Sequence, residues 1–264
     1  MSFAEVNGTR LHYQFDGPEH GPVIMLSNSL GADVTMWDAQ VPILVDAGYR
    51  ILRYDSRGHG QSVVTPGPYT MDMLTQDAVG LLDRLRLNRV MFCGLSKGGM
   101  VGQMVGATFP KRVSALVLSS TSAFMGSPEI WDERISTVQA RGMDAVVDAT
   151  IDRWFTRAGQ QQMPDVVEKI RRMILNTPVE GFCASCAAIR DMDQRESIRS
   201  ISVPTLIMVG EHDQGTPVSA AELIHERIPE SKLHGTQHGA HLIDVEKAAE
   251  CNRILLDFLN PNQG

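Results

Sequence analysis

The sequence is poor in cysteine and has no long apolar run. Its four cysteines stand at positions 93, 183, 186 and 251, and so few in a chain of this size fit a reducing compartment. Cys183 and Cys186 form a lone C-x-x-C, whereas a structural zinc site needs four ligands. The first residues lack the apolar core of a signal peptide, and no run approaches membrane-spanning length. We therefore expect a cytoplasmic protein that does not bind membranes.

Basic clusters are also lacking. The formal net charge is −7, with 24 Lys and Arg against 31 Asp and Glu. A nucleic-acid partner is not expected, because phosphates require a Lys/Arg face. No His/Asp cluster has the spacing of metal ligands, so no metal is expected either. A small anionic ligand stays possible, since one Arg can hold it.

What the sequence does contain is an alternation of strand-like and helix-like segments. Two strand-like runs are joined through Asn7-Gly8, a dipeptide suited to the positive φ angles of a tight hairpin. Further strand-like runs cover residues 22–27, 50–55, 90–96, 113–120, 203–210 and 231–235. Helix-like segments cover residues 37–47, 70–87, 217–228 and 245–259. This alternation predicts an α/β fold with a mostly parallel sheet of about eight strands and helices on both faces.

The alternation stops between residues 122 and 200. This stretch has a helical pattern in which Met, Trp and Arg are prominent. We predict that residues 122–200 form a helical lid inserted into a core made of residues 1–121 and 201–264.

A G-x-S-x-G motif lies between an apolar run and a helix start, at Gly94, Ser96 and Gly98. A strand that turns at once into a helix strains the residue at the turn and needs neighbours without side chains. The turn presents the serine hydroxyl at a helix N-terminus, where developing negative charge is favoured. Small residues could also serve close strand–helix packing alone. The position of the motif favours Ser96 as a nucleophile.

A serine nucleophile needs a base, and a base needs an orienting acid. His238 and His241 lie on the loop between the last strand-like run and the last helix. We favour His241, which directly precedes the helix, and expect His238 to face solvent. Asp213 follows the run 203–210 and would accept a hydrogen bond from the histidine ring. The order Ser96, Asp213, His241 is that of hydrolases built on this arrangement.

Other carboxylates fit this role less well. The run that ends near residue 119 is followed by SSTSA, which offers no acid. Asp244 and Glu246 are expected to begin the last helix, where acidic side chains suit the helix dipole. For the oxyanion, the candidate donors are the backbone N–H groups of Leu30 and Lys97. We expect the Lys97 side chain to be packed or solvated.

Several longer segments carry a resemblance to a known family. They are LSNSLGADVTMW, RYDSRGHGQS, FCGLSKGGM, GSPEIW, RWF and HLIDVE. With them the chain resembles 3-oxoadipate enol-lactonases of the α/β-hydrolase superfamily over nearly its full length. It departs from them at Lys97, where the family usually has Met. The resemblance implies cofactor-free hydrolysis of a five-membered enol-lactone with an acetate side chain, which gives 3-oxoadipate in bacterial aromatic catabolism.

A lactone with a carboxylate calls for a cation in the lid, and a bidentate Arg is the natural choice. Three lid arginines are candidates: Arg134, Arg153 and Arg190. We prefer Arg134 because it is close to Trp131 in the sequence. Trp131, Trp154 and Met125 would line the substrate pocket or pack within the lid.

The catalytic residues alone leave other functions open. A carboxylesterase, a C–C bond hydrolase or a perhydrolase would share the same Ser-His-Asp set. A receptor for small lactones is a more distant alternative. The expected partner in every case is a small molecule, and the sequence carries no signal of oligomeric state.

Overall fold

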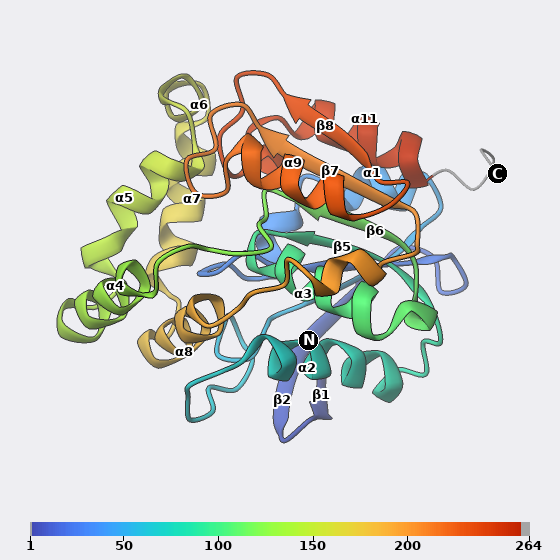
Figure 1. The fold of residues 1–264 in the computed structure, drawn as a ribbon, viewed down its shortest axis with the longest axis horizontal. Coiled ribbons are helices and arrows are strands. Elements are labelled where there is room, and N and C mark those ends of the chain that lie inside the picture. Colours follow the sequence, from blue (N-terminus) through green and yellow to red (C-terminus); the bar gives the residue numbers. More distant parts are fainter. Residues whose placement is uncertain (1, 260–264) are drawn as a thin grey trace.

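The computed structural model describes residues 2–259 and contains an eight-stranded sheet (Figure 1). The strand order is β1-β2-β4-β3-β5-β6-β7-β8. The strands are β1 (Ser2–Val6), β2 (Thr9–Asp16), β3 (Val23–Ser27), β4 (Arg50–Tyr54), β5 (Val90–Leu95), β6 (Val113–Ser119), β7 (Thr205–Gly210) and β8 (Lys232–Thr236). β2 pairs antiparallel with β1 and β4, and the other neighbours pair in parallel. The predicted α/β fold with a mostly parallel sheet is confirmed.

The first two strands form the predicted hairpin. Val6 pairs with Thr9, so the connection consists of Asn7 and Gly8 alone. Both residues have positive φ angles, 44° and 71°. This is the backbone geometry for which Asn-Gly is favoured in two-residue hairpins.

Helices cover both faces of the sheet. They are α1 (Val41–Asp46), α2 (Met71–Arg84), α3 (Lys97–Thr108), α9 (Val218–Arg227), α10 (Ile243–Glu246) and α11 (Ala248–Leu259). In Figure 1, α2, α3 and α9 lie in front of the sheet, and α1 and α11 lie behind it. Within residues 2–259, no helix combines the length and the apolar character needed to cross a membrane.

Two of the predicted helices are interrupted. The segment near residues 37–47 divides into a 3-10 turn, Val34–Trp37, and the short helix α1. Asp33 caps the turn by accepting from the Thr35 N–H at 2.8 Å, and Pro42 stands in the first turn of α1. The last helix divides into α10 and α11 at Lys247.

Between β6 and β7 the chain forms five α-helices. They are α4 (Pro128–Arg141), α5 (Asp144–Trp154), α6 (Arg157–Gln162), α7 (Pro164–Leu175) and α8 (Val179–Arg190). Figure 1 shows them together at one end of the sheet. Buried lid residues such as Ile151 belong to the same hydrophobic cluster as Leu26 and Leu95 of the sheet. The division of the chain into a core and a lid domain, with limits at 121/122 and 200/201, stays a prediction.

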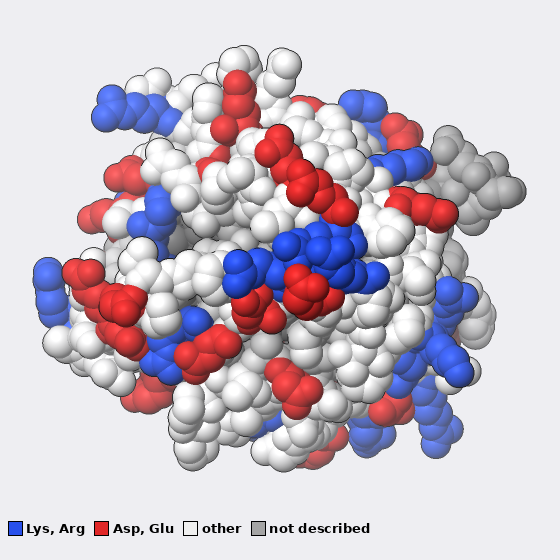
Figure 2. Space-filling view, viewed as in Figure 1, with Lys and Arg blue, Asp and Glu red and all other residues white. Residues whose placement is uncertain are grey.

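Charged residues of both signs are interspersed on the face shown in Figure 2. Among residues 2–259, three arginines are each paired with an acid: Arg195 with Asp193, and both Arg199 and Arg227 with Glu196. Paired charges of this kind do not form the Lys/Arg face that a nucleic acid requires. The expectation of no nucleic-acid partner stays a prediction.

Candidate active site

Ser96 occupies the sharp turn between β5 and α3. Its φ and ψ angles are 56° and −114°, a backbone conformation that residues with side chains rarely adopt. The turn is held on both sides, because the Ser96 N–H donates to the Ser119 carbonyl at 2.9 Å and the Thr121 hydroxyl donates to the Ser96 carbonyl at 2.8 Å. The end of β6 and the loop that follows it thus hold the strained conformation.

The two glycines of the motif are required by close backbone contacts. A Cβ atom at Gly94 would lie 2.2 Å from the Gly98 carbonyl oxygen. A Cβ atom at Gly98 would lie 2.0 Å from the carbonyl oxygen of Ser27, at the end of β3. The spacing of the motif therefore reflects the crossing of α3 over the ends of β3 and β5.

His241 and Asp213 form a buried pair on the loops after β8 and β7. His241 Nδ1 lies 2.8 Å from Asp213 Oδ2, and the two residues are 5% and 4% exposed. The other Asp213 oxygen accepts from the N–H groups of Gly215 and Thr216, both at 2.9 Å, and Oδ2 also accepts from the Thr216 hydroxyl at 2.7 Å. If Nδ1 carries the hydrogen that Asp213 accepts, Nε2 is free to act as a base.

Burial alone would raise the pKa of Asp213. The adjacent His241 and the hydrogen bonds from Thr216 outweigh this effect, and the net result is a pKa below the usual value. The carboxylate is therefore ionised at neutral pH and suited to stabilise a charged imidazole.

Ser96 and His241 line the same cavity of about 270 Å³. Its walls come from the core and from the lid, and include Leu30, Met125, Trp131, Trp154 and Phe182. Asp213 lies directly behind His241. The fold therefore brings the three predicted catalytic side chains together, although their roles stay a prediction.

Leu30 and Lys97, whose N–H groups are the predicted oxyanion donors, lie on the loop after β3 and at the start of α3. Leu30 lines the cavity from the loop after β3. Lys97 is the first residue of α3, and the first N–H groups of a helix have no partner within the helix. Two backbone N–H groups next to a serine hydroxyl can stabilise the negative oxygen of a tetrahedral intermediate.

The Lys97 side chain is packed in the interior. It is 1% exposed, and its Nζ lies 3.1 Å from Ser56 Oγ and 3.5 Å from His59 Nε2. Burial lowers the pKa of Lys97 to about 7. Burial and the nearby Lys97 charge also hold the pKa of His59 well below its usual value. Of the two expected environments, packed and solvated, the structure shows the packed one.

The three candidate lid arginines separate clearly. Arg190 lies outside the cavity and is paired with Asp132 at 2.6 Å and Asp191 at 2.7 Å. Arg134 and Arg153 both line the cavity. Within residues 2–259, no carboxylate lies within ion-pair distance of either guanidinium. Burial and the neighbouring Arg134 lower the pKa of Arg153 to about 10.

Arg153 thus joins the preferred Arg134 at the cavity wall. The sequence names Arg153 as a candidate but does not show whether its guanidinium has an acidic partner, because that depends on which acids the fold places near it. Trp131 and Trp154 line the cavity and are each 6% exposed. Arg134 stacks over the Trp131 ring at 4.8 Å. The tryptophans therefore form the pocket wall and pack within the lid at the same time.

Asp244 and Glu246 lie in the first turn of α10, as predicted. Both are buried, at 1% and 7% exposure, and are not surface charges at a helix end. Asp244 accepts from the Ser119 hydroxyl at 2.7 Å, and burial raises its pKa to about 6. Glu246 accepts from the backbone N–H of Thr156 in the lid and from that of Ala240, both at 2.9 Å. Glu246 thus joins the lid to the loop that carries His241.

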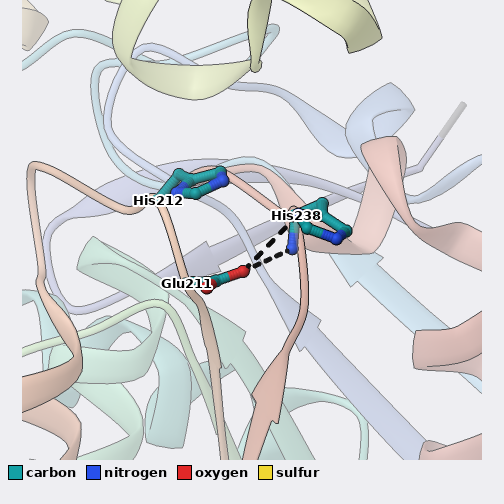
Figure 3. Close-up of side chains that lie close together, drawn as sticks. All are labelled: Glu211, His212 and His238. Carbon is teal, nitrogen blue, oxygen red and sulfur yellow. Dashed lines mark hydrogen bonds and ion pairs between the residues drawn. The ribbon is translucent and has the colours of Figure 1, made fainter.

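A group of possible metal ligands lies on the outer surface of the same loops. It consists of Glu211, His212 and His238 (Figure 3), all exposed. The His238 side chain is 78% exposed, as expected for a residue that faces solvent. The three residues do not have ligand spacing along the chain, so only the fold brings them together.

Comparison with known proteins agrees with this geometry. Residues 22–248 match the family model described as the alpha/beta hydrolase fold. The chain is 33% identical to 3-oxoadipate enol-lactonase 2 of Acinetobacter baylyi, over 93% of this chain and 91% of the relative. It is 32% identical to 3-oxoadipate enol-lactonase 1 of the same organism, over 97% and 95%.

A solved structure is similar over almost the whole chain. The enol-lactonase from Burkholderia xenovorans LB400 is 39% identical, with a TM-score of 0.95 and coverage of 98% of this chain and 99% of the other. The likeness thus includes both the sheet and the lid. The chain belongs to the α/β-hydrolase fold family, as an ester hydrolase similar to enol-lactonases.

Proposed function

We propose that this protein hydrolyses 3-oxoadipate enol-lactone to 3-oxoadipate, as part of the β-ketoadipate pathway of bacterial aromatic catabolism. The similarity to enol-lactonases over more than nine-tenths of the chain supports the reaction type. The observation that supports this substrate is that Arg134 and Arg153 line the cavity of Ser96 and His241 without a carboxylate of residues 2–259 at ion-pair distance.

The proposed reaction has two stages. In the first, Ser96 Oγ attacks the lactone carbonyl while His241 Nε2 takes the hydroxyl proton, and Asp213 stabilises the imidazolium. The N–H groups of Leu30 and Lys97 hold the oxyanion. Collapse of the intermediate breaks the ring C–O bond, and the His241 imidazolium returns its proton to the released enolate, which ketonises and leaves His241 neutral.

In the second stage, water attacks the acyl-enzyme with His241 as base and releases the dicarboxylate. The leaving group stays attached to the acyl chain after the ring opens. Its conversion to a ketone removes the oxygen nucleophile that could close the ring again. The reaction uses water alone and requires no cofactor.

The two arginines supply a reason for a carboxylate-bearing substrate. Two guanidinium groups that share a partly buried wall repel each other, which is why Arg134 contributes to the lowered pKa of Arg153. A substrate carboxylate between them relieves this repulsion and forms charge-assisted hydrogen bonds. The adjacent Trp131 and Trp154 rings can contact the apolar edge of the lactone ring.

The first experiment measures the loss of the enol-lactone's ultraviolet absorbance. We expect many turnovers per molecule of the wild-type protein and almost none for Ser96→Ala. Turnover of nitrophenyl esters without lactone turnover would instead indicate that the protein is a carboxylesterase. Lactone binding without hydrolysis would assign a receptor.

The second experiment tests the arginines with Arg134→Met and Arg153→Met. A hydrogen bond to a charged group contributes about 1.5–3 kcal/mol, so we expect KM to rise about 10- to 150-fold with kcat changed less. Arg190→Met is the matched control, because Arg190 lies outside the cavity and should leave KM unchanged. Equal KM increases with an uncharged ester of the same lactone would contradict the assignment.

The proposal includes a cytoplasmic location. Its support is that all four cysteines are buried and free, which fits a reducing compartment.

A further inference from the structure

The loops that carry Asp213 and His241 also present a second group of chemically competent side chains. Glu211 and His212 follow β7, and His238 follows β8. One ligand atom from each lies within 4.8 Å of the others. Figure 3 shows the three side chains on the facing loops, close to one another and exposed.

The backbone that holds these side chains is well ordered by hydrogen bonds. The Glu211 N–H donates to the Thr236 carbonyl at 3.0 Å, and the His212 N–H donates to the Gly239 carbonyl at 2.8 Å. The Glu211 carboxylate in turn accepts from the His238 N–H at 3.0 Å. His238 has a φ of 54°, so its backbone is held in a conformation that is unusual for a residue with a side chain. Hydrogen bonds thus position the backbone of the three residues, and their side chains are exposed.

The side-chain distances leave room for a shared ion. His238 Nδ1 lies 3.7 Å from Glu211 Oε2, too far for a hydrogen bond. Ligand atoms about 2.0–2.2 Å from one tetrahedral ion are roughly 3.4 Å apart, so a small rotation suffices. The rings of His212 and His238 are 6.1 Å apart at 40°, and both can turn in solvent without repacking.

We propose that Glu211, His212 and His238 bind a divalent transition-metal ion of the zinc class. Two imidazoles and one carboxylate are a ligand set that Zn²⁺ prefers, whereas Mg²⁺ prefers oxygen ligands alone. Three protein ligands leave a fourth position for water. Glu211 and His212 lie on the loop of Asp213, and His238 lies on the loop of His241. The bound ion therefore connects these two loops.

The binding is tested by calorimetric titration of tag-free protein, first treated with a chelator, with zinc chloride and with magnesium chloride. We expect one site of micromolar affinity for Zn²⁺ and at least about 100-fold weaker binding of Mg²⁺. His212→Ala and His238→Ala should each weaken Zn²⁺ binding about tenfold or more. His20→Ala, at an exposed histidine on the loop before β3, should have no effect.

Equal Zn²⁺ affinity in wild type, His212→Ala and His238→Ala would overturn the site. The site contains none of the proposed catalytic residues, so the calorimetric result does not depend on lactone turnover.

Discussion

At the scale of single residues, the site depends on buried charges whose partners the sequence does not reveal. The motif around Ser96 and the loop positions of Asp213 and His241 are local patterns, so the sequence alone predicts these three residues. The burial of Lys97 and Asp244 was not visible, because it depends on Ser56, on Ser119 and on elements far away along the chain.

Lys97 makes the protein less stable as the pH falls. Its pKa is about 7 in the folded protein and 10.5 in the unfolded chain. Below pH 10.5 the unfolded chain takes up a proton that the folded protein does not, so stability decreases until the pH reaches about 7. Lys97→Met should therefore stabilise the protein by a few kcal/mol near pH 7.5 and by less than about 1 kcal/mol near pH 10.

Urea denaturation of both proteins at the two pH values measures this difference. Lys111→Met, at an exposed lysine, is the matched control and should change stability little at either pH. A stability difference that is the same at pH 7.5 and pH 10 would show that the amine does not titrate as described.

Asp244 has the opposite pH dependence. Its pKa is raised from 3.8 to about 6, so the folded protein holds the proton more tightly than the unfolded chain between these values. Stability therefore falls as the pH rises from about 4 to 6. Asp244→Asn, which can still accept from Ser119, should stabilise the protein by up to about 3 kcal/mol at pH 8 and little at pH 4. Thermal unfolding at the two pH values provides the measurement, and a gain confined to pH 4 would contradict it.

At the scale of elements, local signals predicted some segments and missed others. The Asn7-Gly8 hairpin and the strand–turn–helix at Ser96 have strong local determinants, and both were predicted. The division of the last helix at Lys247 was not. It follows from long-range contacts, such as the buried Asp244 and the Gln40 side chain that donates to Asn252 at 3.0 Å.

The turn between β5 and α3 tolerates no side chain at position 98. Gly98→Ala places a methyl group 2.0 Å from the Ser27 carbonyl oxygen, so α3 has to move away from β3. We expect a destabilisation of about 3 kcal/mol or more, and loss of activity in any folded protein that remains. Gly235→Ala is the control, because a Cβ atom there meets nothing within 4 Å. Equal stability of the two variants in urea would contradict this account.

At the scale of the whole molecule, the α/β class, the parallel sheet and the helical insertion followed from the alternation of patterns. The packing of the lid did not, because lid helices carry no local signal for the surface they contact. Lid residues Ile151 and Trp154 share one hydrophobic cluster with the sheet.

This shared core predicts that the lid and the sheet unfold together. Calorimetry should give one transition whose van't Hoff and calorimetric enthalpies agree. Near-ultraviolet circular dichroism, which reports largely on the tryptophans, should give the same midpoint as far-ultraviolet circular dichroism. Two separate midpoints would indicate that the lid is an independent folding unit.

The Glu246 carboxylate has a mechanical consequence for access to the cavity. It bonds to Thr156 and Ala240, and the Leu242 N–H donates to the Trp154 carbonyl at 3.0 Å, so the end of α5 is anchored beside His241. The end of α5 cannot move away from the sheet without breaking these hydrogen bonds, so Arg153, one residue before that end, keeps its place at the cavity wall.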